Sequence, residues 1–163
     1  MSHYLQQEVD FINRTKLIIT QYETFQIEEK DKFEVTLYLN CLVGLLILPK
    51  QHWYNDLPQE SISLLEWGIA PEHIYIIKDG EDKNVKNIAT HIRNSISHYR
   101  FNAFENSFEK IREIQFKDYF VTNEGKENEK KKMTFHAVIP IQNLRKFTDK
   151  LTNTLIEKME QCK

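Results

Sequence analysis

Apolar side chains recur at every third or fourth position in three well-separated segments of this chain, and this spacing restricts the fold more than any other feature. The period is that of an α-helix with one face turned towards a core. We therefore predict amphipathic helices over residues 4–22, 84–99 and 140–159. A fourth segment, residues 33–48, is apolar nearly all round, which is typical of a helix at the centre of a domain.

The composition supports a compact, helix-rich protein. Only four Gly and four Pro occur among the 163 residues, so few positions favour turns. Apolar residues make up 40% of the chain and charged residues 28%, which excludes a disordered protein. The length is that of one unit with its own core. We predict a single domain over residues 1–163.

Between the helices, the pattern is shorter and more mixed. Residues 58–68 predict a short helix that is ended by its glycine, and residues 69–83 permit either a short helix or a loop. Residues 111–116 and 133–139 are rich in β-formers and enclose a polar run, which indicates a hairpin. The sequence therefore predicts a mainly α helical bundle with a small β-hairpin before the C-terminal helix.

Several classes of protein are disfavoured. The start of the chain lacks a basic stretch followed by an apolar run, so we expect no secretory signal and a cytoplasmic location. The most apolar stretch, residues 39–48, is about half of what a membrane-spanning helix needs, so no membrane contact is expected. Neither cysteine has metal-binding spacing. A net charge of −2 means that any contact with RNA must be local.

The segment 84–99 carries two faces of opposite character. Successive residues of a helix are about 100° apart. One face is apolar and is expected to pack on the core: Val85, Ile88, Ala89, Ile92, Ile96 and Tyr99. The other carries amides and imidazoles and is expected to look outward, towards solvent or a partner: Asn87, His91, Asn94 and His98, with Arg93 on the flank.

His98 and Arg93 each have a bland interpretation beside a catalytic one. His98 lies in the last turn, where the negative end of the helix dipole favours a protonated ring and suits proton transfer near neutral pH. An exposed helix-end histidine without a role, or a satisfied core histidine, would occupy the same position. Arg93 could likewise be an ordinary solvated arginine. The residue types alone leave these alternatives open.

The hexapeptide 93–98, with Arg93, Asn94 and His98 at its first, second and last positions, resembles the signature of the HEPN (higher eukaryotes and prokaryotes nucleotide-binding) superfamily of nucleases. The resemblance covers nearly the whole chain. Residues 10–15, residues 34–46 with Pro49, and residues 67–69 are similar to a plasmid- and prophage-borne branch of these proteins.

This resemblance implies a helical bundle that dimerises so that two copies of the signature face each other across a cleft. It implies metal-independent cleavage of RNA, in which the ribose 2′-hydroxyl attacks the adjacent phosphate. His98 would transfer the proton and Arg93 would stabilise charge on the phosphorane. Asn94 would orient the imidazole or a phosphate oxygen. We also expect His91 and Arg100 to contact the RNA.

For biology, the resemblance implies a toxin or phage-defence effector, with an antitoxin protein as a possible partner. No cofactor is expected. A non-catalytic HEPN module that binds nucleotide, RNA or a protein partner is the second interpretation, since a fold can outlive an activity. A metal enzyme using His91, His98 and His136 is the third, but no carboxylate lies on that helix face, so no metal site is expected.

The helix raises one geometric difficulty. Arg93 and His98 are five residues apart, which is roughly 140° around an ideal helix. One helix therefore does not aim both side chains at a single phosphate. Either the helix end unwinds, or the site is completed across the dimer.

Overall fold

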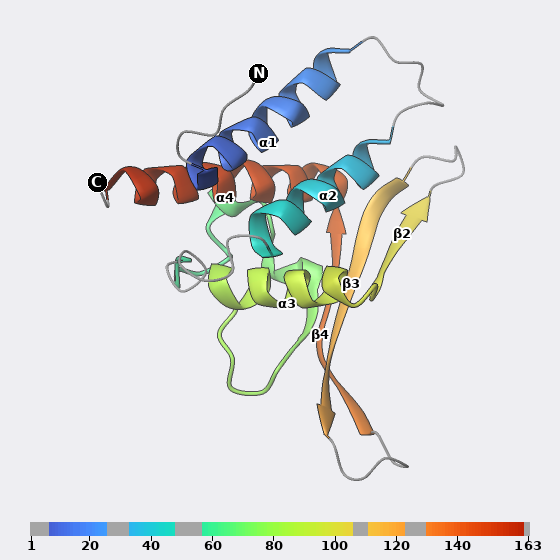
Figure 1. Ribbon diagram of the computed structural model, residues 1–163. Coiled ribbons are helices and arrows are strands. Elements are labelled where there is room, and N and C mark those ends of the chain that lie inside the picture. Colours follow the sequence, from blue (N-terminus) through green and yellow to red (C-terminus); the bar gives the residue numbers. More distant parts are fainter. Residues whose placement is uncertain (1–6, 26–32, 48–56, 106–110, 123–129, 162–163) are drawn as a thin grey trace.

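The computed structural model describes residues 7–25, 33–47, 57–105, 111–122 and 130–161. Within these ranges the chain forms four α-helices, two short 3-10 helices and four strands (Figure 1). In chain order they are α1 Gln7–Thr24, α2 Glu34–Ile47, η3 Leu65–Trp67, η4 Pro71–His73, β1 Ile74–Ile77, α3 Val85–Ser97, β2 Phe101–Glu105, β3 Ile111–Thr122, β4 Lys130–Pro140 and α4 Ile141–Gln161. All four long helices predicted from the sequence are confirmed, although residues 4–6 and 48 lie outside the described residues.

The predicted hairpin is present, but it is the centre of a larger sheet. β3 and β4 pair along their length, and the strand order is β1-β4-β3-β2 with every pair antiparallel. The prediction of a mainly α fold therefore holds only roughly, because the fold is mixed α/β. Residues 69–83, which permitted helix or loop, contain η4 and β1. The two outer strands are four and five residues long, too short to show a clear alternation.

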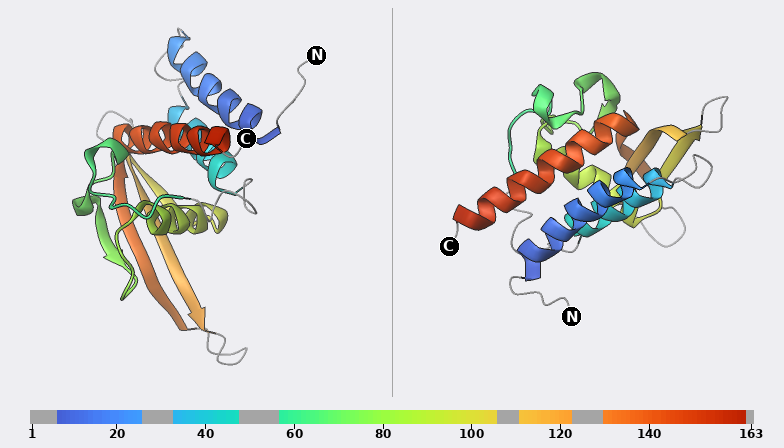
Figure 2. Two further views of the ribbon diagram at one scale, coloured as in Figure 1. Left: turned by 90° about the vertical axis from the view of Figure 1, so that its left-hand side faces the viewer. Right: turned by 90° about the horizontal axis from the view of Figure 1, so that it is seen from above.

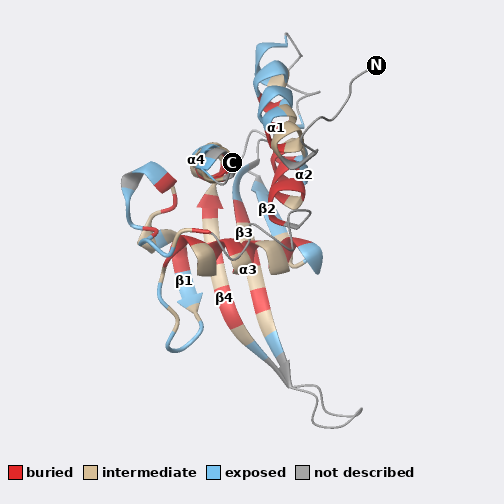
Figure 3. Cartoon of the chain, turned by 60° about the vertical axis from the view of Figure 1, so that its left-hand side comes forward, coloured by how far each residue is buried: buried red, intermediate tan, exposed pale blue. Residues whose placement is uncertain are grey.

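The helices surround one part of the sheet. α3 lies across a face of the sheet, while α4, α1 and α2 stack beyond one end of it (Figures 1 and 2). The β3–β4 hairpin continues past α3 in the other direction (Figure 2). Buried residues gather where α3 meets the sheet and where α2 and α4 pack on this layer (Figure 3). Fully buried members include Leu42, Ile92, Phe116, Phe135 and Phe147.

The apolar face of α3 is buried as predicted, with one exception. Val85, Ile88, Ala89, Ile92 and Ile96 all belong to the core. The prediction that Tyr99 also packs on the core is wrong, because its side chain is 88% exposed. α3 ends at Ser97, and Tyr99 has a left-handed φ of +53°, so the chain leaves the helix before this ring can reach the core.

The short helix predicted over residues 58–68 is reduced to one turn, η3. Trp67 at its end is fully buried, packs against Phe147 and donates a hydrogen bond to Glu60. Gly68 follows with φ +75° and accepts a hydrogen bond from the Asn143 side chain of α4. The glycine therefore ends this turn as predicted. Among the described residues, no helix combines the length and apolar character needed to cross a membrane.

Candidate functional site

The start of α3 is fixed by a side-chain cap. Asn84 has extended backbone angles, and its side-chain oxygen accepts a hydrogen bond of 2.8 Å from the backbone N–H of Asn87. Such a cap satisfies one of the donors that every helix leaves unpaired at its first turn. The Asn87 amide in turn donates to the Asp82 carbonyl at 3.0 Å. The predicted polar face of α3 thus begins with groups engaged in holding the helix start.

His91, one turn further along α3, is buried between two carboxylates. Its side chain lies 2.9 Å from Asp118 on β3 through Nδ1, and 2.8 Å from Glu81 in the preceding loop through Nε2. The ring stacks on Phe135 of β4 at 4.8 Å between centroids. The prediction that His91 faces outward is therefore wrong. The residue is only 6% exposed, because the sheet and the loop after β1 cover this part of the helix.

These contacts favour the charged forms of both partners. Burial opposes a charge on His91, but hydrogen bonds to Asp118 and Glu81 outweigh it and raise the pKa of the imidazole. Burial likewise opposes the charge on Asp118, but hydrogen bonds from His91, Asn94 and the Tyr119 N–H outweigh it and lower the pKa of the carboxyl. We conclude that a carboxylate faces an imidazolium whose two N–H groups both donate.

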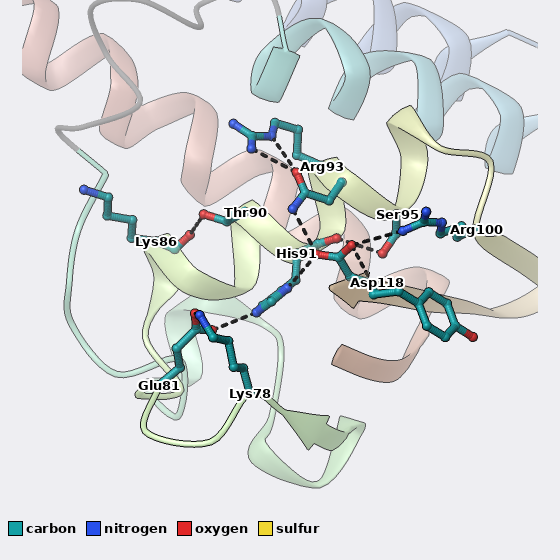
Figure 4. Close-up of polar contacts among 11 residues, drawn as sticks. Lys78, Glu81, Lys86, Thr90, His91, Arg93, Ser95, Arg100 and Asp118 are labelled. Carbon is teal, nitrogen blue, oxygen red and sulfur yellow. Dashed lines mark hydrogen bonds and ion pairs between the residues drawn. The ribbon is translucent and has the colours of Figure 1, made fainter. Parts of the chain in front are cut away.

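Asp118 is the centre of this network, and its side chain is buried, with only 5% exposed. One carboxylate oxygen, Oδ2, accepts hydrogen bonds from His91 Nδ1 and from Asn94 Nδ2, both at 2.9 Å. The other, Oδ1, accepts from the Tyr119 backbone N–H at 2.8 Å and lies 3.5 Å from Arg100 Nη1. Figure 4 shows these contacts, with Glu81 and Lys78 on the far side of His91.

Arg93 is connected to this centre through its neighbour. Its Nη2 and Nε atoms lie 2.9 and 3.3 Å from Asn94 Oδ1, so the amide receives two donors from one guanidinium. The same amide donates through Nδ2 to Asp118. Asn94 therefore links the half-buried guanidinium to the buried carboxylate. In this structure its side chain holds Arg93, and its predicted role of orienting the imidazole or a phosphate oxygen stays a prediction.

Arg100 joins the network from the turn that follows α3. Its backbone N–H donates to the Ser95 carbonyl at 2.7 Å, and its own carbonyl accepts from the Lys117 N–H at 3.0 Å. The guanidinium lies 5.3 Å from the centroid of the Tyr119 ring. Ser95 also donates through its hydroxyl to the His91 carbonyl at 2.7 Å. The end of the helix and the middle of β3 are therefore tied together at Asp118.

His98 lies apart from the network. It is the C-terminal cap of α3, with φ −107° and ψ 12°, and its backbone N–H donates to the Asn94 carbonyl at 3.1 Å. This sparsely populated region of backbone angles often holds active-site residues. The side chain is exposed, and within the described part of the chain it has no hydrogen bond or ion pair. The helix therefore does end at the signature histidine.

A groove opens beside the end of α3, next to α2 and β2. Its volume is about 490 Å³. The residues on either side of His98, Ser97 and Tyr99, line it together with Asn40 of α2 and several apolar side chains. The exposed Tyr99 ring stacks on Phe101 at 6.1 Å. The groove is therefore partly aromatic and partly polar.

The five site residues predicted from the sequence thus divide into two groups. Those that meet around one carboxylate are His91, Arg93, Asn94 and Arg100. His98 stands outside this group. Because both ring nitrogens of His91 are bonded within the chain, we do not assign it a direct contact with RNA, and the predicted RNA contact of Arg100 stays a prediction.

Sequence reasoning missed the two acidic residues that complete the site, Glu81 and Asp118. A signal for Asp118 did exist. Ile114, Phe116 and Asp118 alternate along one strand, and all three are buried. A carboxylate in the inward register of a strand needs a buried partner. Glu81 follows Gly80 in a turn, and nothing in its local pattern distinguishes it from a solvated acid.

The third histidine considered for a metal site lies elsewhere. His136 of β4 pairs with Gln115 Nε2 at 3.0 Å, and its ring lies 5.2 Å from that of Tyr75 in a tilted arrangement. Around His91 the two carboxylates contact opposite ring nitrogens, so they do not converge on one point. In the ranges that the structure describes, no group of three or more His, Cys, Asp and Glu side chains could hold a metal ion.

The polar hexapeptide 93–98 lies at the end of α3, the helix that crosses the sheet, and the chain as a whole is similar to one known family. A family model described as HEPN pEK499 p136 matches residues 1–162. The chain therefore belongs to the HEPN pEK499 p136 family, a HEPN-type family from a plasmid-borne branch, and the resemblance seen in its sequence is confirmed. No curated protein and no solved structure matches the chain.

Membership of a HEPN-type family indicates a nucleotide-binding or ribonuclease-like module. HEPN domains are often ribonucleases, although some are non-catalytic.

Proposed function

We propose that this protein is a metal-independent endoribonuclease. In this reaction the ribose 2′-hydroxyl loses its proton and attacks the adjacent phosphorus, and the bond to the 5′-oxygen breaks. The products are a 2′,3′-cyclic phosphate and a 5′-hydroxyl. The observation that carries the proposal is the end of α3, where Arg93 is held by Asn94 and an exposed imidazole, His98, follows five residues later.

Arg93 is suited to the phosphate. A guanidinium presents a planar fork of donors that matches the oxygens of a phosphate, and its charge stabilises the negative charge that develops on the phosphorane. Its two hydrogen bonds to Asn94 fix the orientation of the plane. A donor that is already oriented costs no reorganisation when the charge develops.

His98 is suited to proton transfer. An imidazole changes its charge near neutral pH and can both remove the proton of the 2′-hydroxyl and protonate the leaving 5′-oxygen. It is exposed and is not engaged within the described part of the chain. The groove beside it has a volume of about 490 Å³, within the usual range for pockets that hold a small molecule. In the proposal a ribose and its base occupy this groove.

A second copy of the chain completes the proposed site. About 140° separate Arg93 and His98 around an ideal helix. No hydrogen bond or ion pair joins the His98 side chain to the Asp118 network within the described residues. A homodimer in which two α3 helices face each other would place Arg93 of one copy near His98 of the other.

The proposed biological role follows from the family. A plasmid-borne branch fits a toxin or phage-defence effector that cleaves RNA in the cytoplasm, with an antitoxin protein as the expected partner.

The test is cleavage of total RNA by purified protein in EDTA. We expect the wild type to produce cyclic phosphate ends. His98→Ala should lower the rate by about 10²-fold or more, the usual contribution of a general acid or base. Arg93→Ala should also remove most of the activity. Arg112→Ala, on an exposed position of β3, is the matched control and should cleave like the wild type.

Two results would change the assignment. A folded, dimeric His98→Ala protein that cleaves at the wild-type rate would remove His98 from the mechanism. Wild-type protein that binds RNA but never cleaves it would favour the alternative, a non-catalytic HEPN module for nucleotide, RNA or protein.

A further inference from the structure

Three polar side chains and one backbone N–H from different parts of the chain depend on one carboxylate. His91 and Asn94 come from α3, Arg100 from the turn after it, and the Tyr119 backbone from β3. Each contacts an oxygen of Asp118 within 3.5 Å. A buried carboxylate is costly unless its acceptor sites are filled. Both oxygens of Asp118 accept hydrogen bonds or contact a cation, and these contacts fix the orientation of His91, Asn94 and Arg100.

The backbone at Asp118 is itself shaped for this role. The pairing of β3 with β4 changes from Asp118 opposite Phe135 to Tyr119 opposite Met133. One residue of β4, Thr134, is therefore extra, which is a β-bulge. Bulges change the direction of nearby side chains and are common beside functional sites. Asp118 lies in the same buried register as Phe116, so its carboxylate points at α3 instead of solvent.

The far side of the network is also charged. His91 connects Asp118 to Glu81, and Glu81 in turn lies 3.4 Å from Lys78. Arg100 approaches Asp118 from the turn between α3 and β2, and the Phe135 ring covers one face of His91 from β4. These are the charged and aromatic groups that face the imidazole. Two carboxylates and three cationic groups thus alternate from Lys78 to Arg100.

We propose that Asp118 is a positioning residue for the phosphate-binding arginine: it fixes the Asn94 amide, and through that amide it fixes the Arg93 guanidinium. This inference rests on the proposed function, because the orientation of the Arg93 guanidinium matters only if Arg93 binds the phosphate during RNA cleavage. Asp118 is buried and touches no substrate. His91 supports it by filling the second acceptor site on the same oxygen.

Replacing Asp118 by asparagine should disrupt this arrangement with little change of shape. An aspartate presents two acceptor oxygens, whereas an asparagine presents one acceptor and one donor group. If its oxygen faces Asn94 and His91, its NH₂ group opposes the Tyr119 N–H and Arg100. In the reverse orientation the NH₂ opposes Asn94 and His91. Either way a donor meets donors. In the reverse orientation Asn94 loses its acceptor, and in the first it keeps only a neutral amide oxygen, which accepts more weakly than a carboxylate.

The first experiment observes Arg93 directly and needs no cleavage. The Nε–H signal of Arg93 in ¹⁵N-labelled protein is assigned by its loss in Arg93→Lys. In Asp118→Asn we expect this signal to move and to exchange with water roughly tenfold faster, as the loss of about one hydrogen bond implies. Glu113→Gln, an exposed carboxylate on the same strand, is the matched control and should leave the signal in place.

A second measurement uses the wild type, so it does not depend on a variant that folds. When the His91 imidazole is titrated, the Arg93 Nε–H and the Asn94 side-chain amide signals should move with the same midpoint. An Arg93 signal that stays constant both through this titration and in folded Asp118→Asn would overturn the inference.

Kinetics then separate the inference from the proposed function. In a wild type that cleaves RNA, Asp118→Asn should lower kcat by about tenfold or more with a smaller change in KM, since Arg93 acts on the transition state. Wild-type kcat in folded Asp118→Asn would overturn the positioning role and leave the ribonuclease intact. A wild type without cleavage would instead overturn the proposed function, and the Arg93 signal would still decide the inference.

Discussion

At the scale of single residues, the histidine between two carboxylates makes the protein's stability depend on pH. The pKa of His91 is raised in the folded state, so folding is favoured by its protonated form. This contribution is fully present below the ordinary histidine pKa of about 6.5 and is lost as pH rises through the folded value. His136, whose pKa is lowered by burial and by Lys117, contributes with the opposite sign.

We therefore predict that His91→Gln removes a fall in stability that the wild type shows above roughly pH 6.5. The free energy of unfolding is measured by urea titration between pH 5 and 9. Subtracting the variant's curve from that of the wild type removes the part due to His136. An unchanged slope in His91→Gln would mean that this ring does not gain charge on folding.

Asp118, the carboxylate that contacts His91 Nδ1, makes the stability of the protein depend on pH in the acidic range. The pKa of Asp118 is lowered in the folded state, so its contribution is present above the ordinary aspartate pKa of about 3.9 and is lost as pH falls through the folded value. The contributions of His91 and Asp118 to stability are both complete only between about pH 3.9 and about pH 6.5.

In this window the two side chains should be strongly coupled. We predict that Asp118→Asn and His91→Gln each destabilise the protein by about 2–4 kcal/mol, and that the double variant is less destabilised than the sum, with a coupling of about 1–3 kcal/mol. Urea titration of all four proteins at pH 6 measures this. Additive effects would show that the two side chains act independently, despite the 2.9 Å between them.

At the scale of elements, the sequence predicts long periodic segments well and short ones poorly. α3 is confirmed because thirteen residues show the helical period clearly. β1 and β2 are four and five residues long, and their strand form comes from pairing with β4 and β3 instead of from local pattern. The same limit applies to His91. Helical spacing placed it opposite the apolar face, but spacing cannot reveal that a sheet and a loop cover that side.

Gly68, in the turn after η3, and Gly80 allow the effect of a left-handed backbone to be separated from the effect of crowding by neighbouring atoms. A Cβ added at Gly68 would lie 2.6 Å from the Lys146 Cβ and 2.9 Å from the Asn143 carbonyl oxygen. Gly80 has a similar φ, +80° against +75°, but a Cβ there would meet nothing within 4 Å.

We predict that Gly80→Ala lowers the free energy of unfolding by about 1 kcal/mol, because a residue with a side chain is strained in a left-handed backbone conformation. Gly68→Ala should cost about 2–4 kcal/mol, because η3 must also move away from α4. Urea midpoints at one pH give the comparison. Equal losses for the two alanines would show that α4 yields to the added methyl group without cost.

At the scale of the whole molecule, the proposed dimer predicts that two inactive variants restore activity to each other. If Arg93 of one copy acts with His98 of the other, a mixed dimer of Arg93→Ala and His98→Ala has one intact site and one doubly damaged site. Random exchange in an equal mixture gives about half mixed dimers, so about a quarter of wild-type activity should return.

The measurement is RNA cleavage before and after the two variants are unfolded together and refolded. Refolding each variant alone is the control and should give no activity. An active wild type whose mixed variants stay inactive would place Arg93 and His98 of the same copy in one site, and the end of α3 would then have to rearrange when RNA binds.

The convergence of several side chains on Asp118 also has a consequence for how this family can change over time. Losing Asp118 alone would leave His91, Asn94 and Arg100 with unmet or opposing polar groups, whereas losing the set together would leave an ordinary apolar interior. Substitutions at these positions should therefore appear jointly among relatives. A relative that keeps His91 and Asn94 but has an apolar residue at position 118 is the combination that these energetics disfavour most.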